Sequence, residues 1–285
     1  MTSLKDARIV VTGATSGIGL AVASACLSEG ARVTIVGRNR EGCENAAALL
    51  GGGAAADPEA LRMEVCDLSR PAEVERLAQR LSGAGPVDAL VSNAGVQPWT
   101  RELTPEGIEL TFATNVLTHF VLVEGLSEAL ANSRLRCVVA TGSMVHRWGK
   151  IDWNALDNPE PFDSQEVYAR SKTELLLLQT AFALRLASMG IGVHTLEPGM
   201  TRTNFARHFQ GFDRFMARVW QIFMRDPGDV ARDFVTLLKR DDLATTSTRY
   251  WYKGSPKTPA SFATDPADAE RLMDYCRSLA VRKST

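Results

Sequence analysis

The stretch TGATSGIG, residues 12–19, decides the fold. It comes directly after an apolar, β-branched run at 8–12 and leads into a helix-length apolar segment at 18–29. Glycines between a strand and a helix let the backbone turn tightly and approach a pyrophosphate, which then lies at the positive end of the helix. A tight connection without a ligand is the alternative interpretation. In this context we predict a dinucleotide-binding loop, although its spacing, G-x-x-x-G-x-G, is longer than the usual fingerprint.

Outward from this loop, short apolar runs alternate with longer helical segments. The predicted strands are 8–12, 32–36, 61–65, 87–91, 136–141 and 192–196, and the predicted helices are 18–29, 40–50, 71–82, 105–131 and 167–189. Such alternation is typical of right-handed crossovers and of a parallel sheet that helices cover on both faces. We therefore predict an α/β fold: a single, doubly wound Rossmann-type domain over residues 1–285.

Composition narrows the classes of partner. The chain has 285 residues with 32 Lys+Arg and 33 Asp+Glu, a net charge of −1, which gives no electrostatic reason to expect nucleic acid as a partner. Five scattered cysteines without a C-x-x-C pair indicate reduced thiols rather than a disulfide framework or a metal site. We see no signal peptide and no uncharged apolar run approaching about 18 residues. The expectation is a cytoplasmic protein without a metal site or a transmembrane segment.

Arg38 bears on the choice of cofactor. It follows the second predicted strand, where an NAD-selective site would place an acidic residue on the ribose 2′-hydroxyl. An arginine suits a 2′-phosphate instead. A solvated surface arginine is the alternative. We therefore favour NADP, as NADPH, and leave NAD open.

Tyr168 and Lys172 are spaced so that the phenol and the ammonium share one helix face. A nearby ammonium favours the phenolate, so we expect the tyrosine's pKa to be lowered toward the range of a general acid or base. An exposed helix contact is the alternative. Ser143, just past the fifth predicted strand, is a candidate hydrogen-bond partner for a substrate oxygen. His146 lies three positions after Ser143 and could reach the site, but a lone loop histidine is usually polar surface, which is our interpretation.

Taken together, these residues make the chain resemble the short-chain dehydrogenase/reductase family. The matching pieces are the glycine motif in 12–19, Asp67, the Asn-Ala-Gly at 93–95, Asn115, Ser143, Tyr168 with Lys172, and the Pro-Gly-Met-Thr at 198–201. Within the family the chain is most similar to the retinol-dehydrogenase-like branch. That similarity is carried by RELTPEG at 101–107, by the long interval from Ser143 to Tyr168, and by TPASFAT at 258–264.

The resemblance implies roles for individual residues. Tyr168 would protonate a substrate carbonyl, Lys172 would lower the pKa of Tyr168 and hold the nicotinamide ribose, Ser143 would orient the carbonyl, and Asn115 would hold a water behind Lys172. The implied cofactor contacts are Gly13, Thr15, Ser16, Gly17, Ile18, Gly19, Arg38, Asn39, Asp67, Leu68, Asn93, Ala94, Gly95, Tyr168, Lys172, Pro198, Gly199 and Thr201. Two positions depart from the family pattern, Ser92 in place of an asparagine and Gly142 in place of a serine or threonine. Neither removes a catalytic group.

A lid over the nicotinamide is expected at about 200–226, where aromatic and apolar residues at helical spacing alternate with arginines. With Trp99, Trp148 and Trp153 expected nearby, we predict a large lipophilic ketone or aldehyde as the small-molecule substrate. Contact of this basic amphipathic segment with a membrane surface or with another subunit is the alternative.

The predicted function is that of an NADPH-dependent ketoreductase. Two alternatives remain open: an NADP-dependent alcohol or retinol-type dehydrogenase working in the oxidative direction, and a non-catalytic NADP-binding regulator or scaffold.

The helices at 105–131 and 167–189 are apolar on more than one face, which suits the helix pair through which many family members form homodimers. Burial within one chain would produce the same pattern.

Overall fold

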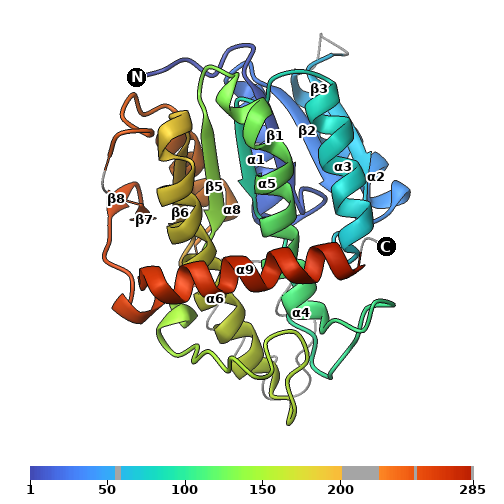
Figure 1. Cartoon of the computed structure of the whole chain (residues 1–285). Helices are drawn as coiled ribbons and strands as arrows, with labels where there is room; N and C mark the ends of the chain where they lie inside the picture. Colours follow the sequence, from blue (N-terminus) through green and yellow to red (C-terminus); the bar gives the residue numbers. More distant parts are fainter. Residues whose placement is uncertain (55–58, 201–224, 247–248, 284–285) are drawn as a thin grey trace.

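A computed structural model of the chain describes residues 1–54, 59–200, 225–246 and 249–283. Within these residues one sheet of eight strands forms the centre of the molecule, in the order β3-β2-β1-β4-β5-β6-β7-β8 (Figure 1). The strands are β1 (Arg8–Thr12), β2 (Arg32–Gly37), β3 (Leu61–Val65), β4 (Ala89–Ser92), β5 (Cys137–Thr141), β6 (Gly192–Glu197), β7 (Tyr250–Tyr252) and β8 (Ser255–Pro256).

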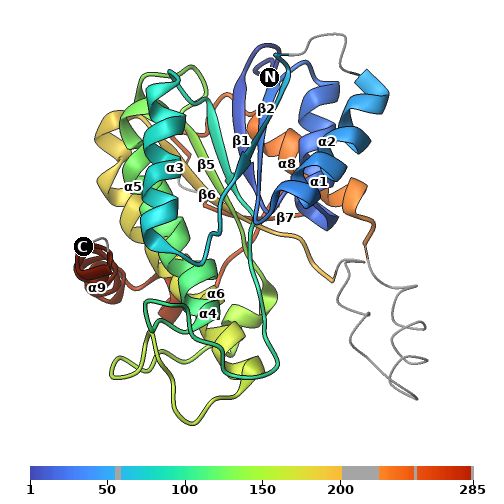
Figure 2. The same ribbon diagram turned by 90° about the vertical axis from the view of Figure 1, so that its right-hand side faces the viewer.

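Helices cover both faces of the sheet. Figure 2 shows α1, α2 and α8 on one side and α3, α5 and α6 on the other. The helices are α1 (Gly17–Ser28), α2 (Arg40–Ala54), α3 (Pro71–Gly83), α4 (Leu110–Phe112), α5 (Thr118–Ala131), α6 (Ser164–Arg185), α8 (Pro227–Leu238) and α9 (Pro266–Lys283). The predicted α/β fold with a doubly wound sheet is confirmed.

The sheet is mostly rather than wholly parallel, which corrects the prediction. β7 extends it in parallel to β6, and β8 then returns antiparallel to β7. The two strands meet at a tight turn formed by Lys253 and Gly254, both of which have positive φ angles, 51° and 70°. Paired positive φ angles are what a two-residue hairpin requires. Strands of three and two residues are too short to show a hydrophobic period, and the sequence pattern therefore missed them.

The helix predicted from residue 105 begins later. Thr104 and Pro105 form a turn that Gly107 reverses at φ 79°, and the first helical residue is Leu110. The carboxylate of Glu109 accepts a hydrogen bond from the Phe112 N–H and thereby caps the helix. The helical stretch Leu110–Ala131 is long and apolar enough to cross a membrane by length and composition. However, 72% of its apolar window is buried, as expected for a core helix.

α9 lies across the outside of α6, α5 and α3 (Figure 1). Its inner face belongs to the same apolar core as the helices beneath it and consists of Ala269, Leu272, Met273, Cys276 and Leu279. Leu175–Leu178 and Phe182, which make the predicted helix at 167–189 apolar on more than one face, are all buried within the single chain. Their apolar character is therefore explained without a second subunit.

The carboxyl ends of β1, β4, β5 and β6 lie at one edge of the sheet, and the chain order reverses between β1 and β4. Open α/β sheets bind ligands in the crevice at this switch point. The predicted lid at about 200–226 lies outside the described residues apart from its borders. At those borders the Arg225 N–H donates to the Met200 carbonyl over 2.7 Å, so the two ends of the segment are adjacent.

Candidate active site

A cavity of about 870 Å³ runs along the carboxyl ends of the strands. It is lined by Gly13, Thr15, Ser16, Gly17, Ile18, Arg38, Asn39, Asp67, Leu68, Asn93, Ala94, Gly95, Ser143, Tyr168, Lys172, Pro198 and Gly199, all predicted from the sequence. Gly19 does not line the cavity, and Thr201 lies outside the described residues. One continuous space thus connects the predicted cofactor contacts with the candidate catalytic groups.

The glycine loop is shaped for a close ligand. Gly13 has φ +64°, and a Cβ there would lie 2.8 Å from the Ala94 Cα. Gly19 has a packing role, since its Cβ would lie 2.3 Å from the Gly13 carbonyl oxygen. Ser16 precedes α1 in an extended conformation, and its side chain does not cap the helix. The first N–H groups of α1 are therefore available to an anion, as a pyrophosphate requires.

Asn93 holds the edges of the cavity together. Its amide nitrogen donates to the Thr12 carbonyl at 3.1 Å, and its amide oxygen accepts from the Thr141 hydroxyl at 3.1 Å. The Thr12 hydroxyl in turn accepts the N–H groups of Asn93 and Ala94. These bonds link the ends of β1, β4 and β5. Because the hydrogen bonds at position 93 are intact, the departure at Ser92 is tolerated.

Arg38 is exposed at the end of β2 and lines the cavity. Among the described residues it has no ion pair, whereas its neighbour Arg40 lies 3.7 Å from Glu44. At the preceding position, Gly37, a Cβ would lie 2.4 Å from the Thr15 methyl carbon. An acidic side chain at 37 would therefore clash, and the next residue along the chain, Arg38, is positively charged.

The candidate catalytic groups come from two elements. Ser143 follows β5, and Tyr168 and Lys172 lie one turn apart on α6. The Lys172 ammonium donates to the Thr141 carbonyl at 3.0 Å and lies 5.6 Å from the centre of the Tyr168 ring. Tyr168 hydrogen-bonds with Ser143. The fold thus brings together the three groups that the sequence predicted.

The effect of burial on these groups corrects one expectation. Burial raises the pKa of Tyr168, and the hydrogen bond with Ser143 offsets this only in part. The pKa of Tyr168 is therefore raised in this arrangement, whereas we expected it to be lowered. Burial also lowers the pKa of Lys172 itself to about 8. The reason is that removal from water penalises the charged form of each group.

Asn115 lies in a π-helical turn, Ala113–Leu117, between α4 and α5. Its amide accepts from the Val96 N–H at 2.8 Å and donates to the Val96 carbonyl and the Ser171 hydroxyl. A Cβ on Gly95 would lie 3.3 Å from the Asn115 amide oxygen and 3.8 Å from the Lys172 nitrogen, so both side chains border Gly95. The Asn115 side chain therefore fixes the loop after β4, and its water-holding role stays a prediction.

Further lining residues come from the connection between β4 and α4. They are Val96, Gln97, Glu102, Leu103, Thr104, Pro105 and Leu110. The sequence interpretation missed them because it placed Pro105 at the start of a helix. Trp99 and Trp148 are exposed, while Trp153 packs against Arg271 of α9 at 4.2 Å and belongs to the core. The expectation that Trp153 contributes to the substrate region is wrong.

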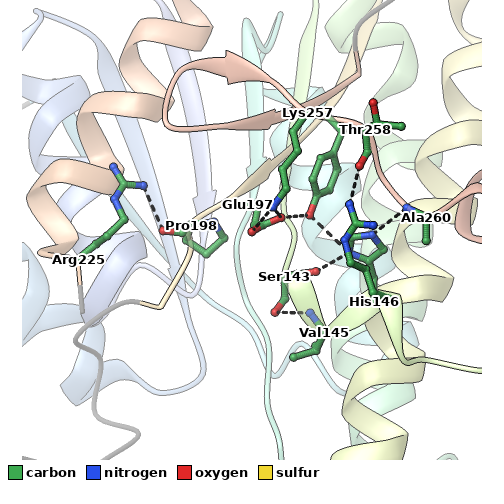
Figure 3. Close-up of polar contacts among 11 residues, drawn as sticks. Ser143, Val145, His146, Glu197, Pro198, Arg225, Lys257, Thr258 and Ala260 are labelled. Atoms are coloured by element: carbon green, nitrogen blue, oxygen red, sulfur yellow. Dashed lines mark hydrogen bonds and ion pairs between the residues drawn. The ribbon is translucent and has the colours of Figure 1, made fainter. Parts of the chain in front are cut away.

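A buried polar network behind Ser143 was not predicted (Figure 3). It contains His146, Glu197, Tyr250 and Lys257, joined by hydrogen bonds and one ion pair. His146 is 0% exposed, so its interpretation as polar surface is wrong. A second cavity of about 510 Å³ lies on the side of Tyr250 facing α6 and contains none of the predicted site residues.

The short-chain dehydrogenase family model matches residues 7–211. This chain belongs to the short-chain dehydrogenase family. It is a short-chain oxidoreductase that acts on CH–OH or C=O groups, and the cavity described above is its candidate site for a nicotinamide cofactor.

Relatives support the retinol-dehydrogenase-like branch. The chain is 31% identical to "Retinol dehydrogenase 14" of Mus musculus, covering 93% of this chain and 83% of that protein. It is 33% identical to a "Probable oxidoreductase" of Streptomyces lividans, covering 95% and 97%. Among solved structures, the RhlG/NADP active-site complex of Pseudomonas aeruginosa has a TM-score of 0.70 at 24% identity, covering 92% of this chain and 98% of that one. That likeness concerns the fold.

Proposed function

We propose that the protein reduces a ketone or aldehyde group on a large lipophilic molecule to the alcohol, with NADPH as the reductant. The observation that carries the proposal is the single cavity that has Ser143, Tyr168 and Lys172 at one end and Arg38 at the other. The intact trio argues against a non-catalytic regulator. Oxidation of an alcohol with NADP is the alternative, since the same groups serve both directions.

In reduction, Tyr168 donates its proton to the carbonyl oxygen of the substrate. Because burial raises the pKa of this phenol, the proton is in place at neutral pH. Ser143 accepts the Val145 N–H at its hydroxyl oxygen over 3.4 Å. Its own O–H, which hydrogen-bonds with Tyr168 in this structure, would be donated to the carbonyl oxygen of a bound substrate. Lys172, fixed by the Thr141 carbonyl, holds positive charge beside the phenol. Bound NADPH would supply the hydride to the carbonyl carbon.

Two observations support NADPH over NADH. Arg38 offers an exposed guanidinium without an ion pair in the described part of the chain, and a guanidinium binds phosphate through paired hydrogen bonds. Gly37 leaves no room for the acidic side chain that would bind a ribose 2′-hydroxyl. The first N–H groups of α1 would hold the pyrophosphate.

The lipophilic substrate is supported by the name of the mouse relative, a retinol dehydrogenase. Apolar side chains of Leu103 and Leu110 add to the lining of the cavity.

A cytoplasmic location is also part of the proposal. It is supported by the five cysteines, which are free and buried, because a reducing compartment would keep them as thiols. Cell fractionation followed by immunodetection tests that location.

The function is tested by following NADPH oxidation with a panel of carbonyl compounds, from small sugars to long-chain and polycyclic ketones. We expect turnover that favours the large apolar members. Tyr168→Phe should lower kcat by about 10²- to 10⁴-fold while NADPH binding persists, because only the proton donor is removed. The matched control is Tyr275→Phe, which removes a hydroxyl that bonds Asp157 under α9, away from the cavity.

Normal turnover by Tyr168→Phe would refute the assigned acid. A preference for small polar carbonyls would refute the substrate class. NADPH binding without turnover across the whole panel would favour the regulator instead.

A further inference from the structure

We propose that His146 is a positioning residue for Ser143, held in a single tautomer by the segment that follows β8. The inference rests on the proposed function, since it concerns the serine that orients the substrate carbonyl.

The hydrogen bonds of His146 define its protonation. Its Nε2 lies 3.1 Å from the backbone nitrogen of Ala260, and its Nδ1 lies 2.7 Å from the Ser143 carbonyl oxygen (Figure 3). The Ala260 N–H can only donate, so Nε2 accepts and carries no proton. The proton of the neutral ring is therefore on Nδ1 and is donated to the Ser143 carbonyl. Since His146 is fully buried, water does not compete for either bond.

The ring of His146 is itself held in place by Tyr250. The two rings meet edge to face with 5.4 Å between their centres, and the Tyr250 hydroxyl lies 3.5 Å from Nδ1. That hydroxyl donates to a Glu197 carboxylate oxygen at 2.6 Å, and the Lys257 ammonium lies 2.8 Å from both Glu197 oxygens. The carboxylate, 2% exposed, is thus paired and hydrogen-bonded rather than left isolated.

This network joins the two loops that form the catalytic end of the cavity. Ser143 follows β5, whereas Glu197 ends β6 directly before Pro198 and Gly199, which line the cavity. Arg147 adds a bond from the helical turn after Ser143 to the Thr258 carbonyl. The hairpin of β7 and β8 and the residues after it therefore hold the Ser143 loop against the end of β6.

The consequence for catalysis is geometric. Ser143 is held by two hydrogen bonds. Its carbonyl accepts from the His146 ring, which fixes the backbone, and its hydroxyl oxygen accepts from the Val145 N–H, which orients the side chain. A displacement of about 1 Å in a reacting group can cost roughly 10²-fold in rate. Loss of the Nδ1 bond should therefore lower the rate of the chemical step without weakening NADPH binding.

Two amide substitutions distinguish the contribution of the Nδ1 hydrogen bond from that of the Nε2 hydrogen bond. In His146→Asn the side-chain N–H₂ can occupy the position of Nδ1 and keep the bond to Ser143. In His146→Gln the amide reaches the position of Nε2 and keeps a partner for Ala260. The Ser143 carbonyl then loses the side-chain donor at 2.7 Å and keeps only the longer bond, 3.3 Å, from the backbone N–H of residue 146. We expect His146→Gln to lower kcat about 10- to 100-fold with an unchanged KM for NADPH. His146→Asn should retain kcat within about threefold.

A double-mutant cycle shows whether the effect passes through the serine. In the Ser143→Ala background, His146→Gln should have little further effect on kcat. The same fold-loss in both backgrounds would overturn the proposal, as would equal losses in the Asn and Gln variants. Thermal unfolding and NADPH binding of each variant identify any variant that fails to fold.

A measurement that does not depend on enzyme activity tests the inference about His146 separately from the proposed function. Long-range ¹H–¹⁵N NMR of the imidazole nitrogens should show His146 protonated on Nδ1 alone in the wild-type protein. A ring protonated on Nε2 would overturn the inference even in an active enzyme. If the wild type reduced no carbonyl while His146 showed the Nδ1 tautomer, the proposed function would fail and the assigned geometry of the loop would stand.

Discussion

Arg38 is the residue on which cofactor selection depends. It lines the cavity next to Gly37 and is not engaged in an ion pair within the described ranges. A charge-assisted hydrogen bond contributes about 1.5–3 kcal/mol. We therefore expect Arg38→Ala to raise the KM for NADPH about 10- to 100-fold and to leave that for NADH nearly unchanged. Steady-state kinetics with both cofactors measure this.

The matched control is Arg40→Ala, which removes an exposed arginine that faces Glu44 on α2. It should leave the ratio of the two KM values as in the wild type. An equal rise for NADH and NADPH in Arg38→Ala would contradict recognition of the 2′-phosphate.

His119 predicts how stability depends on pH. Its Nε2 donates to the Gln179 amide oxygen at 2.9 Å inside the core, and burial lowers its pKa to about 4 from 6.5. The unfolded chain binds a proton below pH 6.5, whereas the folded chain does so only near pH 4. Stability should therefore fall by about 3 kcal/mol as the pH drops through this window. In His119→Gln that part of the loss should vanish.

Urea unfolding of both proteins at pH 7 and pH 4 measures the difference. Equal losses of unfolding free energy in His119→Gln and the wild type would show that His119 is not the group responsible.

The residues that were easiest to predict from the sequence are the candidate catalytic residues. Ser143, Tyr168 and Lys172 were found because their types and their place relative to strands are restrictive, and the fold brings them together. The buried contact network of His146 and Glu197 was not predicted, because a single histidine or glutamate carries no sequence pattern. Their pairing depends on Tyr250, more than fifty residues further along the chain than Glu197, and on the hairpin that carries it.

At the scale of elements, Gly149 controls how the segment after Ser143 packs on α6. A Cβ at this position would lie 2.2 Å from the Ala169 carbonyl oxygen and 2.5 Å from the Thr173 hydroxyl. Thr173 also donates to the His146 and Gly149 carbonyls. Gly149→Ala should therefore push α6 and its Tyr168 outward, costing about 1–3 kcal/mol of stability and lowering kcat.

The control for this change is Gly83→Ala at the end of α3, where an added Cβ would have no heavy atom within 4 Å. That variant should be as stable as the wild type or up to about 1 kcal/mol more stable. Thermal unfolding and kcat of the two variants are compared. If Gly149→Ala had the unfolding temperature and the kcat of the wild type, α6 would accommodate the added Cβ and the prediction would be wrong.

The elements themselves were predictable where they are long or buried. Five strands, β1, β2, β4, β5 and β6, follow their β-branched runs because a strand that is covered on both faces is apolar throughout. β3, at the edge of the sheet, is partly exposed and carries Arg62 and Glu64 among its apolar residues. The start of the helix at Leu110 was not predictable from Thr104-Pro105, which resembles a capped start. Glu109, which does the capping, follows a turn whose reversal at Gly107 only the three-dimensional structure reveals.

The whole molecule keeps its thiols out of reach of solvent. All five cysteines are free and buried, and burial raises the pKa of Cys26, Cys66 and Cys137 to about 12. Because the thiolate is the reactive form, we expect the native protein to resist Ellman's reagent. All five thiols should react once the chain is unfolded in guanidinium chloride. Rapid labelling of the folded protein, located by mass spectrometry, would contradict this.

The position of α9 has a consequence for biosynthesis. Synthesis runs from the amino end, so every strand of the sheet is made before residues 266–283 can cross α6, α5 and α3. Until then the aromatic ring of Phe112, which later meets Tyr275 edge to face at 6.2 Å, faces water together with the surrounding core. Exposed apolar surface of this kind makes nascent chains prone to aggregation. We therefore expect a chain that lacks α9 to aggregate more readily than one that contains it.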